Sequence, residues 1–334
     1  MSIQVSNTNQ DRIALIRFQP SDEREFNTFS AAVKHGLSHR PRFLPCQYLY
    51  DSVGSNLFER ICEQPEYYLT RIEDSILHTH AEEMVTGWDN PPVIIELGSG
   101  SSSKTRRLIE AAIKLYGRLH YVPIDVSETI LERTARKLID DYRQLRITGI
   151  VSDYHSAFRL VSDRIHEPKL FIFLGSSLGN YEHKDALNLL QRLRTLLTSS
   201  DRFLFGADLI KDGKTLEAAY NDAAGITARF CKNILERINR ELGGNFDLNF
   251  FRYEARYVSE RQRVEMHLIS DIEQTVLIPV LNLTIHFVPE ESIHVENSHK
   301  YTPAILNHLS VSSGFTEENS WSDPAALFRI QRWK

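Results

Sequence analysis

The amino-acid sequence predicts an α/β protein, in which helices cover both faces of a largely parallel β-sheet, joined to a smaller α+β unit. Between residues 93 and 207, apolar runs of strand length alternate with stretches whose apolar residues recur at helical spacing. Such alternation is typical of parallel sheets covered on both faces. Residues 246–288 instead alternate apolar and polar side chains in strand fashion, which indicates hairpins of a second unit.

Five apolar runs are the expected strands of the sheet. They are residues 93–95, 120–124, 147–151, 170–174 and 203–207. The run Leu-Phe-Ile-Phe-Leu at 170–174 is the most apolar, whereas the run at 147–151 is weakened as a strand by its glycine. We expect helices over residues 108–115, 130–138 and 187–196, and mainly helical, polar structure near residues 23–90.

Composition narrows the class of protein. The 334 residues are 42% hydrophobic and 25% charged, as in a globular protein with a sizeable core. The formal net charge of −5 disfavours nucleic acid as a partner, and we expect the basic run at residues 104–107 to be the solvated face of a helix. Neither a signal peptide nor an apolar run long enough to span a bilayer is visible, so no membrane partner is expected.

The three cysteines argue against metal and disulfide chemistry. Cys46, Cys62 and Cys231 are far apart in the sequence and form no Cys-x-x-Cys pair, so neither a zinc site nor a disulfide framework is predicted. We therefore expect a protein of a reducing, cytoplasmic compartment that holds no metal.

The loop after the first expected strand carries the clearest ligand signal. Ligands of such sheets bind outside the carboxyl ends of the strands, and here residues 96–105 read Glu-Leu-Gly-Ser-Gly-Ser-Ser-Ser-Lys-Thr. A dinucleotide site needs a third glycine where Ser103 stands, and a P-loop needs a glycine directly before Lys104. An acidic residue before Gly-x-Gly instead favours S-adenosylmethionine, because a carboxylate repels a pyrophosphate but tolerates a sulfonium or an amine. The alternative is a plain turn with an exposed Glu96.

Polar residues also follow the next three expected strands. Asp125 can accept both hydroxyls of a ribose, although it also begins a helix-capping pattern. Asp153 and Tyr154 can hold an adenine by a hydrogen bond and stacking, or be an ordinary loop pair. Asn180 ends the loop after the fourth strand, where its amide can bind a substrate carboxylate or amine, unless this loop is only a tight turn.

Seven segments form a recognisable set. They are residues 50–58, 65–71, 96–105, 173–180, 219–227, 263–266 and 296–300. The most specific are Pro-Glu-Tyr-Tyr at 65–68 and Ala-Tyr-Asn-Asp-Ala-Ala-Gly at 219–225. Together the segments resemble the histidine Nα-methyltransferases of ergothioneine biosynthesis over nearly the whole chain.

The resemblance implies a class I methyltransferase core with a Rossmann-like sheet, and a separate substrate-binding domain. The core would comprise residues 72–210 and 301–334, and the substrate-binding domain residues 1–71 and 211–300. The cofactor would be S-adenosylmethionine, with S-adenosylhomocysteine as its product. The cofactor-binding residues would be Tyr50, Glu96, Gly98, Gly100, Lys104, Asp125, Asp153 and Tyr154.

The resemblance also implies which residues hold the reacting end of the substrate. Tyr67, Asn180 and Tyr220 would bind the α-amine and carboxylate of an amino acid, and Tyr50 and Phe58 would lie near the reacting centre. As residues taken singly, the two tyrosines at 67 and 220 could also be ordinary half-buried aromatics.

Three later residues would bind the substrate's ring. The resemblance assigns Glu296 and Ser298 to the imidazole and Met266 to the lining of the ring site. By itself a glutamate is more often a solvated charge and a methionine more often part of the core. Placed against an imidazole N–H, the carboxylate would make a charge-assisted hydrogen bond.

The reaction implied is methylation of the α-amine of free L-histidine up to Nα,Nα,Nα-trimethylhistidine (hercynine), by a monomer. The amine must first lose a proton, for which Tyr50, Tyr67 or an ordered water could be the acceptor. A first alternative is a methyltransferase of the same family acting on tryptophan, tyrosine or a tryptophan-derived alkaloid precursor. Others are a nicotinamide-dependent oxidoreductase and an inactive cofactor-binding regulator.

Overall fold

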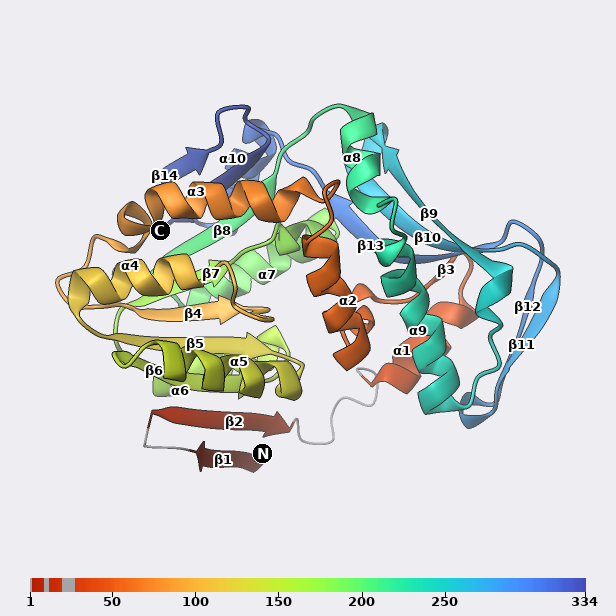
Figure 1. The fold of residues 1–334 in the computed structure, drawn as a ribbon, viewed down its shortest axis with the longest axis horizontal. Helices are drawn as coiled ribbons and strands as arrows, with labels where there is room; N and C mark the ends of the chain where they lie inside the picture. Colours follow the sequence, from red (N-terminus) through yellow and green to blue (C-terminus); the bar gives the residue numbers. More distant parts are fainter. Residues whose placement is uncertain (1, 9–11, 20–27) are drawn as a thin grey trace. The chain divides into compact units, whose positions relative to one another are not determined.

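The computed structural model describes residues 2–8, 12–19 and 28–334, which divide into two compact units (Figure 1). The described part of the first unit comprises a hairpin within residues 2–19, residues 69–210 and residues 301–334, and that of the second comprises residues 28–68 and 211–300. Each unit is built from segments far apart in the sequence.

The first unit contains a nine-stranded sheet in the order β1-β2-β6-β5-β4-β7-β8-β15-β14. All five predicted strands are present and pair in parallel. They are β4 (Val93–Leu97), β5 (Leu119–Asp125), β6 (Leu145–Val151), β7 (Lys169–Phe173) and β8 (Arg202–Asp208). The antiparallel strands β15 (Phe328–Trp333) and β14 (Glu317–Ser322) extend the sheet beyond β8. The predicted α/β fold class is therefore confirmed.

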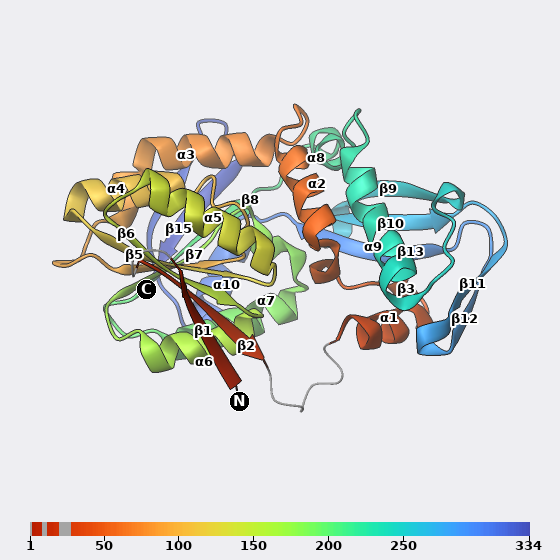
Figure 2. The same cartoon turned by 60° about the horizontal axis from the view of Figure 1, so that its bottom comes forward.

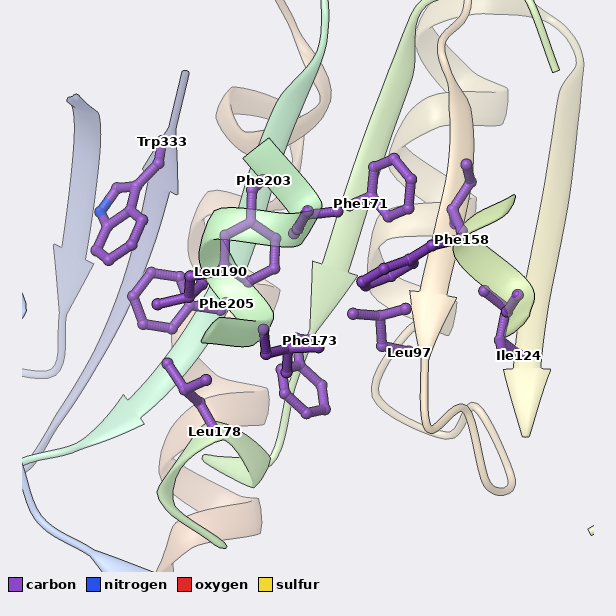
Figure 3. Close-up of a cluster of buried hydrophobic side chains, with 14 of the residues drawn as sticks. Leu97, Ile124, Phe158, Phe171, Phe173, Leu178, Leu190, Phe203, Phe205 and Trp333 are labelled. Atoms are coloured by element: carbon purple, nitrogen blue, oxygen red, sulfur yellow. The ribbon is translucent and has the colours of Figure 1, made fainter. Parts of the chain in front are cut away.

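Helices cover both faces of this sheet (Figures 1 and 2). One face carries α3 (Tyr68–Val85), α4 (Arg106–Tyr116) and α5 (Glu128–Asp141), and the other α6 (Tyr154–Arg164), α7 (His183–Leu196) and α10 (Pro303–Ser313). On the second face the strands and helices bury a continuous apolar core rich in phenylalanine, which includes Phe158, Phe171, Phe173, Phe203 and Phe205 (Figure 3). Burial of these apolar side chains is the main force that holds the strands, and therefore their ends, in place.

The sequence patterns did not predict α10, β14 or β15, and they missed two further features of the first unit. Helix α6 was not predicted, and neither were strands β1 (Ser2–Thr8) and β2 (Ile13–Gln19), which form an antiparallel hairpin. Because β2 pairs in parallel with β6, the hairpin belongs to the first unit. The expectation that residues 1–71 all belong with the second unit is therefore wrong for the described part of residues 2–19.

The second unit combines a four-stranded sheet, in the order β3-β13-β10-β9, with a separate hairpin of β11 and β12. Its strands are β3 (Arg42–Phe43), β9 (Phe251–Val258), β10 (Arg263–Ser270), β11 (Gln274–Ile278), β12 (Leu283–Phe287) and β13 (Ser292–His299). The predicted hairpins between residues 246 and 288 are thus confirmed.

Helices and short 3-10 turns complete the second unit. The helices are α1 (Phe29–Ser38), α2 (Ser52–Cys62), α8 (Gly213–Tyr220) and α9 (Ile226–Leu242), and the 3-10 turn η2 spans Cys46–Leu49. The apolar face of α9 packs against β9 and β10 (Figure 2). Within the described residues, no helix combines the length and apolarity needed to cross a bilayer.

Candidate active site

The residues predicted to bind ligands fall into two groups, one in each unit. In the first unit, the turn after β4 is held against β5, because the backbone N–H groups of Gly98 and Ser99 both donate to the carbonyl of Ile124. Gly98 has φ of +65°, and a Cβ there would lie 2.6 Å from the hydroxyl of Tyr154. The turn therefore requires glycine for its backbone conformation and for the close approach of this tyrosine.

Glu96 is buried at the end of β4 and is not the exposed glutamate of the plain-turn alternative. Its carboxylate accepts hydrogen bonds from the hydroxyls of Thr105, at 2.5 Å, and Tyr121. Burial raises the pKa of Glu96 to about 7 despite these two donors. The residue thus ties the glycine loop and the start of α4 to the sheet, and direct contact with a ligand stays a prediction.

Asp125, at the end of β5, faces the same loop. Its carboxylate accepts from the backbone N–H groups of Gly100 and Ser127, both at 2.9 Å, while burial raises its pKa. Because α5 begins at Glu128 with Ser127 as its N-cap, the capping pattern expected to begin at Asp125 does not form. A role toward a ribose stays a prediction.

Asp153 and Tyr154 begin α6. Asp153 caps this helix, because its carboxylate accepts from the backbone N–H and the hydroxyl of Ser156 at 3.0 and 2.8 Å. The ring of Tyr154 meets Phe173 edge-on, with 5.6 Å between the centroids. The tyrosine is therefore fixed next to the glycine loop, where the sequence analysis expected an adenine.

Lys104 is not part of a solvated helix face. Its ammonium pairs with the fully buried carboxylate of Glu73 on α3, while Arg106 pairs with Asp141 at 2.7 Å and Arg107 with Asp74 at 3.1 Å. The expectation of a solvated helix face is therefore wrong for Lys104, whose partner is fully buried, whereas the side chains of Arg106 and Arg107 at the start of α4 are 26% and 38% exposed.

The loop after β7 is anchored by the same glutamate. Glu73 accepts the backbone N–H of Gly175 with both oxygens, at 2.8 and 2.9 Å, and the hydroxyl of Ser176 accepts the N–H of Asp208 at 3.0 Å. Asn180 ends the 3-10 turn η3 (Ser177–Asn180) that follows and is half-buried. The loop is a tight turn, which was the alternative to a substrate-binding loop. The same turn also gives Asn180 a fixed position.

In the second unit, four predicted residues form a chain of aromatic rings. Tyr50 contacts Phe58 at 5.5 Å between centroids, Phe58 contacts Tyr67 at 6.3 Å, and Tyr67 contacts Tyr220 at 5.9 Å. All three contacts are edge-on, which is a favoured arrangement for aromatic pairs. Phe230 on α9 closes one end of the chain, 5.2 Å from Tyr50.

The remaining predicted residues lie on neighbouring strands of the same unit. Successive side chains of a strand point to opposite faces, so Glu296 and Ser298 share one face of β13, and Lys300 follows two residues later. Met266 on β10 lies directly opposite Glu296 in the strand pair. All four residues are buried, and Lys300 is completely so. The strand pair therefore brings Glu296, Ser298 and Met266 together beside a cation, Lys300, to which the sequence assigned no role, and their contact with a substrate ring stays a prediction.

Glu296 lies in a buried position that disfavours its charge. Burial raises its pKa to about 8, although the hydroxyl of Tyr50, which donates to Oε1 at 3.4 Å, and the charge of Lys300 act in the opposite direction. Burial, and after it the charge of Glu296, raises the pKa of the Cys46 and Cys231 thiols. A ligand that donates an N–H to this carboxylate would stabilise its ionised form.

Lys300, Tyr220 and Ser298 form a closed triangle of hydrogen bonds. The ammonium donates to the hydroxyl of Tyr220 at 2.7 Å and to that of Ser298 at 2.8 Å. The two hydroxyls lie 2.7 Å apart, and the ammonium is 4.7 Å from the centroid of the Tyr220 ring. The described residues contain no group of three or more His, Cys, Asp or Glu side chains arranged to hold a metal ion.

Comparison with known protein families shows to which family the chain belongs. The family model described as histidine-specific methyltransferase, SAM-dependent, matches residues 29–334. The chain belongs to this family of S-adenosylmethionine-dependent methyltransferases. The match spans the second unit from residue 29 onward and residues 69–210 and 301–334 of the first unit.

Relatives of known activity agree with this assignment. The methyltransferase is 36% identical over 298 residues to the histidine N-alpha-methyltransferase of Mycobacterium tuberculosis, a match that covers 89% of this chain and 92% of the relative. It is 34% identical over 298 residues, with the same coverage, to the enzyme of that name from Mycolicibacterium smegmatis. An L-tryptophan methyltransferase of Psilocybe serbica is 27% identical over 347 residues, which cover 95% of this chain and 96% of the relative.

Sequence reasoning missed two residues that organise the methyltransferase site. Glu73 lies 31 residues from Lys104 and in the middle of a helix, where a glutamate is ordinarily solvated, and nothing local marks it as buried. Lys300 had a usable signal, because period-two spacing from Glu296 and Ser298 places all three on one face of a strand.

Proposed function

We propose that this methyltransferase transfers methyl groups from S-adenosylmethionine to the α-amine of free L-histidine, giving Nα,Nα,Nα-trimethylhistidine (hercynine) for ergothioneine biosynthesis. The observation that carries the proposal is the buried pair of Glu296 and Ser298 beside Met266. We propose with it that the enzyme is a cytoplasmic monomer. The net charge of −5 supports a small-molecule substrate over nucleic acid.

The pair on β13 fits a neutral imidazole. Such a ring offers one N–H donor and one bare nitrogen acceptor, and a carboxylate next to a hydroxyl offers the complementary acceptor and donor. Met266 supplies a polarisable side chain on which a flat ring packs well. Amino acids whose side chains lack ring nitrogens would leave the Glu296 carboxylate without a ring N–H and the Ser298 hydroxyl without a ring acceptor, and unsatisfied buried hydrogen-bonding capacity is costly.

The residues of the first unit fit S-adenosylmethionine. Gly98 lacks the Cβ that would press on the Tyr154 hydroxyl at 2.6 Å, Asp125 offers a carboxylate at the end of β5, and Lys104 offers a cation. Tyr154 would stack on the adenine, Asp125 would accept the ribose hydroxyls, and Lys104 would face the methionine carboxylate. When bound, the cofactor supplies a sulfonium methyl group that an amine lone pair can displace.

The chain's own contribution to the reaction is to bind, orient and deprotonate the amine. Asn180, Tyr67 and Tyr220 are proposed to hold the α-amine and carboxylate, and correct orientation of the reactants can contribute roughly 7–11 kcal/mol. Among the proposed proton acceptors, the contact of Tyr50 with Glu296 at 3.4 Å favours Tyr50. When the hydroxyl oxygen of Tyr50 takes a proton from the amine, Tyr50 can pass its own phenolic proton to the carboxylate of Glu296.

The proposal is tested by substrate profiling of the purified protein. The enzyme is incubated with S-adenosylmethionine and each of the twenty amino acids, and the products are identified by mass spectrometry. Histidine should be methylated on the α-amine up to the trimethylated betaine, where the nitrogen has no lone pair left. Preferential methylation of tryptophan or tyrosine would favour the alternative within the family, and no methylation of histidine would refute the proposal.

A further inference from the structure

Lys300 has no role in the function proposed above, yet it contacts two of the residues in that proposal. Its ammonium is completely buried and donates to the hydroxyls of Tyr220 and Ser298, at 2.7 and 2.8 Å. A buried cation costs much more than a buried apolar side chain of similar length unless it is well bonded. A packing role would be served better by an apolar residue.

The triangle fixes which way the hydroxyls can donate. A hydroxyl has one proton to donate and two lone pairs with which to accept, and both hydroxyls already accept from Lys300. Since they lie 2.7 Å apart, one proton is used in the bond between them, and the other hydroxyl keeps its proton for a further acceptor. The phenol is the more acidic group and thus the better donor, which favours donation from Tyr220 to Ser298.

In that arrangement both lone pairs of Ser298 are occupied, and its proton is directed to a ligand. We propose that Lys300 is a positioning residue that makes Ser298 a donor to the bare ring nitrogen of histidine, while Glu296 accepts from the ring N–H. The inference rests on the proposed function. Lys300 is not among the expected substrate contacts. Through Ser298 it would nevertheless decide which nitrogen of a neutral imidazole must carry the proton.

The charge of Lys300, one residue beyond the end of β13, also acts on Glu296 within that strand. The charge lowers the pKa of that carboxyl, against the larger effect of burial. The other titratable groups near Glu296 are the hydroxyls of Tyr50 and Tyr253 and the thiols of Cys46 and Cys231. Loss of Lys300 should therefore raise the pKa of Glu296 and shift histidine binding toward higher pH.

The test is calorimetric titration of L-histidine into protein saturated with S-adenosylhomocysteine. Lys300→Met should weaken histidine binding about tenfold or more and leave the affinity for S-adenosylhomocysteine nearly unchanged. In a Ser298→Ala background the same substitution should have only about a twofold further effect, because the hydroxyl that Lys300 directs is absent. The matched control is Lys211→Met, since Lys211 donates to the hydroxyl of Tyr68 at 2.6 Å in the same unit; it should bind histidine as the wild type does.

Three results would overturn the inference. The first is wild-type histidine affinity in Lys300→Met, and the second is an equal loss with and without Ser298. The third is a ratio of the variant and wild-type dissociation constants that is the same at about pH 7 and about pH 9, because the change in Glu296 predicts a larger ratio at the lower pH. If Lys300→Met does not unfold cooperatively, Lys300→Gln is measured with the same expectations. Failure of the wild type to bind histidine would instead contradict the proposed function.

Discussion

The buried carboxylate of Glu73 accepts the backbone N–H of Gly175 with both of its oxygens, at 2.8 and 2.9 Å. The same carboxylate pairs with Lys104 on the glycine loop, and a Cβ on Gly206 of β8 would clash with it. One side chain of α3 therefore connects the proposed cofactor loop, the loop that leads to Asn180 and the sheet. Its position makes it a polar anchor of the ends of β4 and β7 in the first unit.

Removing this anchor should destabilise the protein strongly. Glu73→Ala leaves a buried N–H and a largely buried ammonium without their carboxylate, and breaking a buried pair in this way costs about 3–5 kcal/mol. Urea denaturation measures the loss. The control is Glu82→Ala, which breaks the exposed pair with Lys114, whose side chains are 64% and 72% exposed, and which should cost about 1 kcal/mol or less. Equal denaturation midpoints for the two variants would contradict the anchoring role.

Gly98 should be required for cofactor binding as well as for folding. Its φ of +65° makes Gly98→Ala strained, at a cost of about 1–3 kcal/mol, and the new methyl group would press on the Tyr154 hydroxyl. We expect a clear loss of affinity for S-adenosylhomocysteine, measured by calorimetry, that is partly restored in Gly98→Ala combined with Tyr154→Phe.

A second glycine separates the effect of backbone strain from the effect of contact with Tyr154. Gly117 has φ of +74°, and a Cβ there would meet nothing within 4 Å. Gly117→Ala should therefore lose stability as Gly98→Ala does, without losing affinity for S-adenosylhomocysteine. Equal affinity in the two variants would show that the close approach of Tyr154 to the loop does not matter for binding.

The buried Glu296 should make stability depend on pH. Burial raises its pKa in the folded protein to about 8, above the ordinary value of 4.5 that applies to the unfolded chain. Between these values the folded protein holds a proton that the unfolded chain has released, so raising the pH through this window destabilises the fold. Glu296→Gln cannot ionise, and its stability relative to the wild type should rise by a few kcal/mol, in order of magnitude, from about pH 5 to about pH 8.

Urea denaturation of both proteins across this range checks the prediction. Glu96, whose pKa is also raised, contributes a slope of the same sign in both proteins, so the difference between them isolates Glu296. A difference that stays constant with pH would mean that Glu296 is ionised, or well solvated, in the folded protein.

The sheet of the first unit could be predicted because its strands are buried on both faces. Such strands appear as continuous apolar runs, of which residues 170–174 are the clearest example. The β1–β2 hairpin could not be predicted in the same way. Its place beside β6 is fixed by pairing between residues more than a hundred positions apart, and a long-range pairing leaves no local pattern.

The two groups of site residues differed in how far the sequence could predict them. Residue type and loop position pointed to Asp125 and Gly98, whereas only the resemblance to the family pointed to Glu296 and Ser298. The burial of Glu73 could not be read from the sequence, because it is a charged residue whose partners, Lys104 and Gly175, lie far along the chain, whereas Lys300 was marked only by its spacing from Ser298. The sequence around each of these charged residues predicts a solvent-exposed side chain. Only the packing of segments distant in sequence buries it.

The central claim is most directly tested by calorimetric titration of L-histidine into wild-type protein and Glu296→Ala, both saturated with S-adenosylhomocysteine. The account predicts tight binding by the wild type and a loss of about tenfold or more in the variant, with the affinity for S-adenosylhomocysteine retained. Equal histidine affinity in the two proteins would contradict it.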